Sequence, residues 1–146
     1  MTNTVNSHIS SFSETKIMSS KDTIEIIFPN TKTRKAAKIF VNWIKKQDGI
    51  ATKNAVSEFA NSLNSGTNSQ EFSYFKYSRR NFYMTILRKL IDMGFLQHNV
   101  PIWDSKLNKT IYVYKINIFD IPKKPPQIGF WKLSYYMCKK WNKLFF

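Results

Sequence analysis

The sequence has little of the chemistry on which disulfides, metal sites and most enzymes depend. Its 146 residues include a single cysteine, Cys138, so no disulfide can form within the chain and no cysteine cluster can hold zinc. Only two histidines are present, which excludes a histidine-rich metal site. The single cysteine favours a reducing compartment, and we expect a cytoplasmic protein. We also expect no metal and no cofactor.

Acidic residues are also scarce. The nine Asp and Glu residues are scattered, without a close pair that recurs on a common face. The sequence contains no glycine-rich phosphate loop, no HExxH or CxxC motif and no Ser/His/Asp set. Because acid–base catalysis needs such groups within reach of one another, we expect a protein that is not an enzyme and has no small-molecule substrate.

Long apolar segments are missing as well. No window of about 18 apolar residues predicts a membrane span. No basic segment followed by an apolar one predicts a secretory signal. Residues 1–22 are rich in Ser, Thr and Asn and have no apolar period, which predicts a flexible N-terminal segment. Residues 24–28, Ile-Glu-Ile-Ile-Phe, form a short strand-like run that Pro29 stops, and we expect a strand there that packs on the domain that follows.

Positive charge is what the chain has in excess, with a net charge of +14. Residues 1–30 carry a net charge of −1, residues 31–121 carry +9 and residues 122–146 carry +6. Nineteen of the 23 basic residues are Lys, a bias that an AT-rich coding sequence also produces. The charge favours nucleic acid as the partner, with an anionic membrane surface or an acidic protein as alternatives.

Two amphipathic helices are expected at the start of the domain. From Thr31 the apolar residues recur with a helical period, until Asp48-Gly49 ends the pattern. Ile50-Ala51 is then a short extended piece, and Thr52 is a good N-cap for a second helix. The expected core faces comprise Ala36, Phe40, Trp43, Ile44 and Gln47 in the first helix and Ala55, Val56, Phe59, Ala60 and Leu63 in the second.

A third helix and a β-hairpin follow in the expected order. The helix covers residues 78–93, and its apolar face comprises Phe82, Tyr83, Ile86, Leu87, Leu90 and Met93. Residues 95–103 and 110–118 are expected to pair as strands around a polar tip at residues 104–109. We expect Trp43 to pack in the core and Trp103 to pack at the base of the hairpin.

This order of elements resembles the winged helix-turn-helix family of small prokaryotic, archaeal-type regulators. The most specific local match is residues 86–96, where Leu, a polar pair, Gly and two apolar residues lead from the recognition helix into the wing. The resemblance covers residues 31–121 and implies an α+β, mainly α fold: a winged helix with a three-helix core plus β-hairpin wing. We expect the winged-helix domain to comprise residues 23–121. One departure is the insert at residues 64–77, where the family has a turn of about 3–4 residues.

The resemblance also implies double-stranded DNA binding, sequence-specific or semi-specific, in transcriptional regulation. A recognition helix enters the major groove at its N-terminal end, while basic side chains around it contact phosphates. Arg79 or Arg80 would pair with guanine, and Asn81 would pair with adenine. The residues expected at DNA are Ser78, Arg79, Arg80, Asn81, Thr85, Arg88, Lys89, Lys106 and Lys109.

The C-terminal part is a second amphipathic unit. Residues 122–127 form a Pro/Lys linker, and residues 128–146 predict a C-terminal amphipathic helix rich in aromatic and basic residues. We expect its apolar face to form a homodimer interface. The alternatives are that it packs on its own domain, or that it docks to a protein assembly or anionic membrane surface. The last of these is the alternative function, with the winged helix as a basic scaffold. The residues expected at the interface are Phe130, Trp131, Leu133, Met137, Trp141, Leu144 and Phe145.

Overall fold

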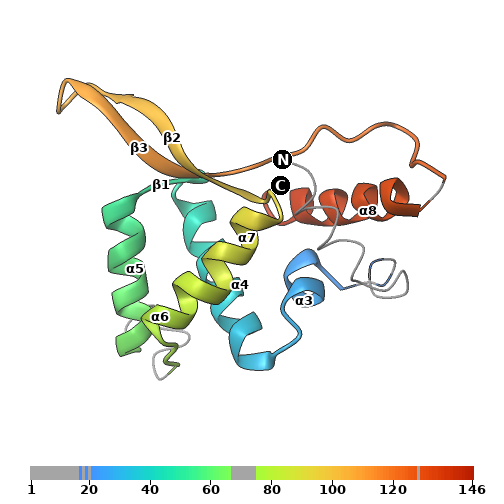
Figure 1. Ribbon diagram of the computed structural model, residues 1–146, viewed down its shortest axis with the longest axis horizontal. Helices are drawn as coiled ribbons and strands as arrows, with labels where there is room; N and C mark the ends of the chain where they lie inside the picture. The colour runs from blue at the N-terminus through green and yellow to red at the C-terminus, as the bar shows by residue number, and fades with distance from the viewer. Residues whose placement is uncertain (1–16, 18, 20, 67–74, 128) are drawn as a thin grey trace.

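Helices and a small antiparallel sheet share one hydrophobic core (Figure 1). The computed structural model describes residues 17, 19, 21–66, 75–127 and 129–146. Within them the strands follow the spatial order β1-β3-β2, and both neighbouring pairs are antiparallel. The α+β class, with more helix than strand, was expected from the sequence and is confirmed.

Helix α4 (Thr31–Lys46) forms where the first core helix was predicted. The Asn30 side chain accepts a hydrogen bond from a backbone N–H of the first turn at 3.0 Å, which satisfies one of the amides left free at a helix start. The chain leaves the helix through Gly49, whose φ is 78°. A Cβ atom on Gly49 would lie 2.7 Å from the Ile116 side chain, so both conformation and space favour glycine there.

Strand β1 (Ile50–Thr52) leads directly into helix α5 (Lys53–Ser65). The Thr52 hydroxyl accepts a hydrogen bond from the Ala55 N–H at 3.0 Å, which confirms the predicted N-cap. Gly66 ends α5 with a φ of 82°, the left-handed conformation typical of helix C-termini.

The predicted insert at residues 64–77 is described at its two ends, and residues 67–74 lie outside the described residues. Tyr77 is buried, and its backbone N–H donates to the Leu63 carbonyl at 3.0 Å. The Tyr77 hydroxyl lies 3.1 Å from the Thr33 hydroxyl of α4. The second end of the insert therefore joins the core and connects α5 to α4.

The predicted third helix is continuous and contains one widened segment. It comprises α6 (Arg79–Asn81), η1 (Phe82–Leu87) and α7 (Arg88–Asp92), and is called the α6–α7 helix below. In η1 the backbone hydrogen bonds span five residues, as in the bond from the Arg88 N–H to the Tyr83 carbonyl. A π-helical turn brings side chains five positions apart to one face, so Phe82 and Leu87 are both buried.

Three phenylalanines join these helices. The rings of Phe40 (α4), Phe59 (α5) and Phe82 (α6–α7 helix) have centroids 5.1 to 5.5 Å apart, in tilted and edge-on arrangements that aromatic pairs favour. None of the three is more than 5% exposed. Trp43, which was expected in the core, is half-buried and packs against this group, with its ring centroid 4.9 Å from that of Phe59.

Strands β2 (Leu96–Asp104) and β3 (Lys109–Ile116) form the predicted hairpin, and β3 also pairs with β1. A bulge interrupts β2, and Asn99 within it has a φ of 54°. Pro101 lacks an N–H group, and a sheet tolerates proline in an edge strand such as β2. The tip of the hairpin extends beyond the helices (Figure 1).

The strand predicted at residues 24–28 is wrong, because helix α3 (Thr23–Ile27) occupies this position. The Asp22 carboxylate accepts a hydrogen bond from the Glu25 N–H at 2.8 Å and caps the helix. Side chains three positions apart then share a face, and Ile24 and Ile27 are both buried. The strand was predicted because residues 24–28 are rich in β-branched Ile and too few to show a helical period. The capping residue, Asp22, lies outside this run.

Most of the predicted flexible segment at residues 1–22 lies outside the described residues. Its described members pack against the domain: Ile17 is fully buried, and the Lys140 ammonium donates to the Ser19 carbonyl and, at 2.7 Å, to the Lys21 carbonyl. These described residues therefore contact the domain, although they precede its predicted boundary at residue 23.

The C-terminal helix α8 (Gly129–Lys143) packs on its own domain, beside α3 (Figure 1). The Thr23 hydroxyl donates to the Met137 carbonyl at 3.1 Å. The Trp141 indole donates to the Asn117 carbonyl at 2.7 Å, and its ring centroid lies 4.7 Å from that of Phe95. Of the three alternatives for this helix, the structure therefore shows intramolecular packing.

This packing uses most of the face that was expected at a dimer interface. Met137 and Trp141 are buried in the chain's own core, and Trp131 is exposed. The other members of the face are partly buried against the same core, and they are Phe130, Leu133, Leu144 and Phe145. An interface with a second copy through Met137 and Trp141 would require α8 to leave its place.

We expect the variant Trp141→Ala to lower the free energy of unfolding by about 3–5 kcal/mol, the usual cost of removing a buried large aromatic ring. The indole hydrogen bond and the contact with Phe95 are both lost. Trp131→Ala is the matched control, because Trp131 is 67% exposed and its loss should change stability by no more than about 0.5 kcal/mol. Guanidinium titration followed by circular dichroism measures both, and equal stabilities for the two variants would contradict the packing of α8.

Candidate nucleic-acid interface

The outward face of the α6–α7 helix is polar and basic. Its inward face is buried against α4 and α5, so the side chains opposite are left at the surface. Among the residues predicted for DNA contact, the exposed ones on this helix are Arg80, Asn81, Thr85 and Arg88. Met84 was not among the predicted residues; it is 54% exposed and lies four positions after Arg80 and four before Arg88.

Arg80 is the cation at the start of this face. Among the described residues its guanidinium has no hydrogen bond, ion pair or ring contact, and its side chain is exposed. The neighbouring Ser78 caps the helix, because its hydroxyl accepts a hydrogen bond from the Asn81 N–H at 3.2 Å. Ser78 is therefore used to begin the helix, and Arg80 is available to a ligand.

Arg79 differs from Arg80 although the two are adjacent in sequence. One guanidinium nitrogen of Arg79 donates to the Ser57 carbonyl at 3.0 Å and to the Asn61 side-chain oxygen at 2.8 Å. The other donates to the Ser57 hydroxyl at 3.2 Å, and the guanidinium lies 5.0 Å from the Tyr83 ring centroid. Arg79 therefore holds the start of the α6–α7 helix against α5 and positions the residues that follow.

Lys89 is also used inside the fold. Its ammonium donates to the Ile27 carbonyl at 2.9 Å and lies 5.6 Å from the Phe28 ring centroid. Burial lowers the pKa of Lys89, because the charged ammonium loses part of its hydration. Lys89 joins the end of the α6–α7 helix to α3, and its geometry is that of a structural contact.

Arg88 carries a weak internal ion pair. Its Nε lies 3.9 Å from a carboxylate oxygen of Asp92, and the Arg88 side chain is 66% exposed. Exposed pairs at this spacing contribute only about 0.3–0.5 kcal/mol. A phosphate that approached this face would therefore compete with Asp92 at little cost.

The tip of the hairpin presents Lys106 and Lys109, which are both exposed as expected. Asp104 shapes the tip: its Oδ1 accepts hydrogen bonds from the Lys106 N–H at 2.9 Å and the Leu107 N–H at 3.3 Å. The expectation that Trp103 packs at the base of the hairpin is wrong, because Trp103 lies next to the tip and is 63% exposed.

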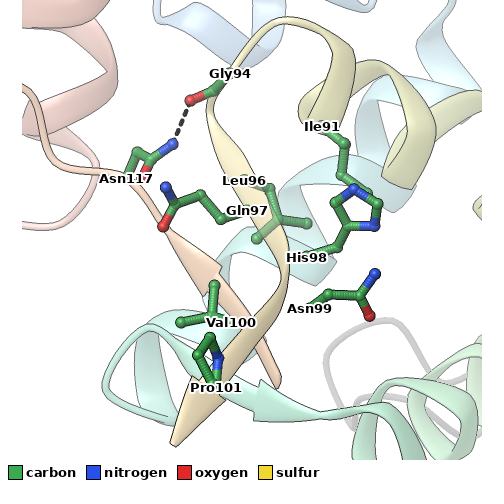
Figure 2. A pocket seen from close by; sticks show the side chains of 9 residues that line it. All are labelled: Ile91, Gly94, Leu96, Gln97, His98, Asn99, Val100, Pro101 and Asn117. Carbon is green, nitrogen blue, oxygen red and sulfur yellow. Dashed lines mark hydrogen bonds between the residues drawn. The ribbon is translucent and has the colours of Figure 1, made fainter. Parts of the chain in front are cut away.

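A pocket of about 590 Å³ lies beside the bulge of β2. Figure 2 shows Gln97 and Asn117 on one side of the strand and His98 and Asn99 on the other. The Asn117 amide donates to the Gly94 carbonyl at 2.6 Å, which ties the end of the hairpin to the end of the α6–α7 helix. The nine described lining residues include no carboxylate, thiol or cationic amine, so the lining offers hydrogen-bonding groups and apolar surface.

Comparisons with known proteins add no family to this description. No family model, curated protein or solved structure matches the chain. The chemistry that the described surface offers is therefore the basis for function: guanidinium groups that donate in a fixed fork, an exposed Asn amide, and lysines on a projecting hairpin.

The alternative of a tail that docks to an assembly or membrane has limited exposed apolar surface. Of the described residues in the tail, Trp131 and Phe146 are the large apolar side chains that are mainly exposed, at 67% and 88%. Among the described residues, no helix is long and apolar enough to cross a bilayer. Docking through the predicted face would require α8 to separate from the core.

We expect Arg79→Ala to destabilise the domain by about 1.5–3 kcal/mol, because hydrogen bonds from a charged donor to α5 are lost. Arg80→Ala is the adjacent control and should change the free energy of unfolding by no more than about 0.5 kcal/mol. Urea titration of the two variants makes the comparison. If Arg80→Ala were the more destabilising, the assignment of Arg79 as the positioning residue would be wrong.

We expect the Cys138 thiol to react slowly with iodoacetamide in the folded chain. Burial raises the pKa of Cys138 to about 11, because the thiolate is poorly solvated there. At pH 8 roughly a quarter of an unperturbed thiol is thiolate, against on the order of 0.1% at the raised pKa. Mass spectrometry should show alkylation on the order of 100-fold faster in guanidinium, and equal rates would contradict the burial of Cys138.

Proposed function

We propose that this chain is a winged-helix protein that binds double-stranded DNA in transcriptional regulation. The α6–α7 helix would be the recognition helix, and the β2–β3 hairpin would be the wing. The observation that carries the proposal is the exposed face of the α6–α7 helix, which presents Arg80, Asn81, Thr85 and Arg88 in a chain with a net charge of +14.

The arrangement of elements supports the winged-helix part of the proposal. β1 lies between the first two core helices in sequence and pairs with β3 of the hairpin, so the hairpin is joined to the helices by backbone hydrogen bonds. The α6–α7 helix leads directly into β2. A winged helix needs its wing and recognition helix on one rigid unit, and this pairing supplies the connection.

The exposed face suits the major groove, which is about 12 Å wide and admits one α-helix. At the start of the helix, Arg80 would donate two hydrogen bonds to guanine and Asn81 would pair with adenine. Thr85 and Arg88, one and two turns further on, would reach bases or phosphates. Lys106 and Lys109 at the wing tip would contact the flanking backbone.

The structure refines the list of expected contacts. Ser78, Arg79 and Lys89 make contacts within the chain, so we assign them the positioning of the helix. The guanidinium of Arg79 holds α5, and the ammonium of Lys89 holds α3. In this proposal the remaining predicted residues, which are exposed, contact the DNA. Because Arg79 and Lys89 are then not at the DNA, fewer phosphates are neutralised than the full set of predicted residues would neutralise.

We expect duplex DNA affinity to fall steeply as salt rises, because each phosphate contact contributes a slope of about −0.9 in log K against log salt. Arg80→Ala should weaken binding by about 1–3 kcal/mol. Arg88→Ala should reduce the salt slope by about 1, as expected for loss of a phosphate contact. Fluorescence anisotropy of labelled duplex at several salt concentrations measures both quantities.

Lys143→Ala is the matched control for these variants. Lys143 is exposed on α8, outside both the α6–α7 helix and the hairpin, so its removal subtracts the same charge at a residue to which the proposal assigns no DNA contact. It should leave both the affinity and the salt slope close to those of the unmodified chain. Duplex binding that is absent, or that falls equally with Arg80→Ala and Lys143→Ala, would refute recognition by the α6–α7 helix.

A further inference from the structure

One face of the hairpin changes from buried to exposed along its length. Ile116, Tyr114 and Tyr112 occupy alternate positions of β3 and therefore share one face of the sheet. Ile116 is buried and Tyr114 half-buried, whereas Tyr112 is 54% exposed. The core-facing side of the sheet thus continues past the helices that cover its base.

A second aromatic ring stands on this uncovered part. Pro101 lies directly opposite Tyr112 in the β2–β3 register, and Trp103 is two positions further along β2, so both are on the Tyr112 face. Trp103 is 63% exposed. We call Trp103 and Tyr112 the aromatic face of the hairpin.

The hairpin around the aromatic face is basic. Asp104 is the one acidic residue between positions 96 and 116, and its carboxylate accepts hydrogen bonds from backbone N–H groups of the tip. Lys106 and Lys109 are exposed at the tip, next to Trp103. A partner for this surface must combine planar apolar groups with negative charge, and nucleic-acid strands have both.

We propose that the aromatic face stacks on unpaired DNA bases, so that the preferred ligand is duplex DNA with a short unpaired region. This inference rests on the proposed function and specifies its substrate. Aromatic side chains beside lysines are the usual means of holding unpaired bases, because every base has a π-face and every nucleotide carries a phosphate. Bases within an intact duplex already stack on each other and offer no free face.

The spacing of the two positions on the sheet suits this ligand. Diagonal neighbours on one face of an antiparallel pair lie ~7–8 Å apart. Stacked bases repeat every ~3.4 Å along a strand, so a base held between two rings needs twice this distance, about 6.8 Å. Trp103 and Tyr112 are such diagonal neighbours, so their positions on the sheet are separated by about the distance that one base between two rings would need.

Two labelled probes test the inference: a duplex, and the same duplex with a short mismatched bubble at its centre. We expect the unmodified chain to bind the bubble about tenfold tighter, the gain from one stacked base. Trp103→Ala and Tyr112→Ala should each remove this preference while duplex affinity stays unchanged. Trp103→Phe, which keeps a ring, should retain most of it.

Two controls complete the experiment. Trp131→Ala removes an equally exposed tryptophan from α8 and should leave the preference intact. Arg80→Ala should weaken binding to both probes by the same factor, because its contacts are to paired DNA. Circular dichroism confirms that the hairpin variants fold, as expected for changes at exposed positions.

The outcomes separate the two proposals. Equal affinity for the probes, with no effect of Trp103→Ala, overturns the aromatic face and leaves duplex recognition standing. Binding to the bubble alone overturns duplex recognition and supports the aromatic face. A dimer in sedimentation that Trp103→Ala dissociates, together with equal probe affinities, would show that a second copy covers this face and would also overturn the inference.

Discussion

The contact among Phe40, Phe59 and Phe82 is the constraint on which the surface depends. One ring comes from each core helix, so the three helices cannot rotate independently without separating a buried aromatic group. The π-helical turn adds to this constraint, because it buries Leu87 on the same side as Phe82. With the inward face of the α6–α7 helix determined by packing, its polar residues have only the outward face to occupy.

Several cations of this basic chain stabilise the fold itself. Arg79, Lys89 and Lys140 each donate to a backbone carbonyl of a segment that is distant in sequence, and each connects that segment to its own helix. The Ile27 carbonyl lies at the end of α3 and the Lys21 carbonyl lies outside the helices, so these two donors satisfy groups that lack a helical partner, whereas the Ser57 carbonyl lies within α5. The net charge therefore overstates the charge available to a partner, and the exposed set around Arg80, Arg88 and the hairpin tip is the relevant one.

The C-terminal helix and the hairpin both show what a sequence pattern leaves undecided: which apolar residues are covered within the chain and which stay exposed. The apolar face of α8 was expected to meet a second copy, yet Trp141 completes the chain's own core. Trp103 was expected to pack at the base of the hairpin, yet it lies exposed near the tip. An amphipathic pattern indicates that the apolar face of a helix or strand is buried, but it does not indicate which surface buries that face.

The α+β class, the three core helices and the cap at Thr52 could be predicted from the sequence, because a helix and its cap depend on residues within about four positions of one another. The hairpin could be predicted because two strand-like runs flank one short polar tip. Helix α3 was predicted as a strand, because five residues are too few to show a helical period. The tertiary structure decided that Arg79 is held while Arg80 is free of described contacts, and that α8 packs against α3. These outcomes depend on partners such as Thr23 and Met137, 114 positions apart, and no local pattern records which distant surfaces meet.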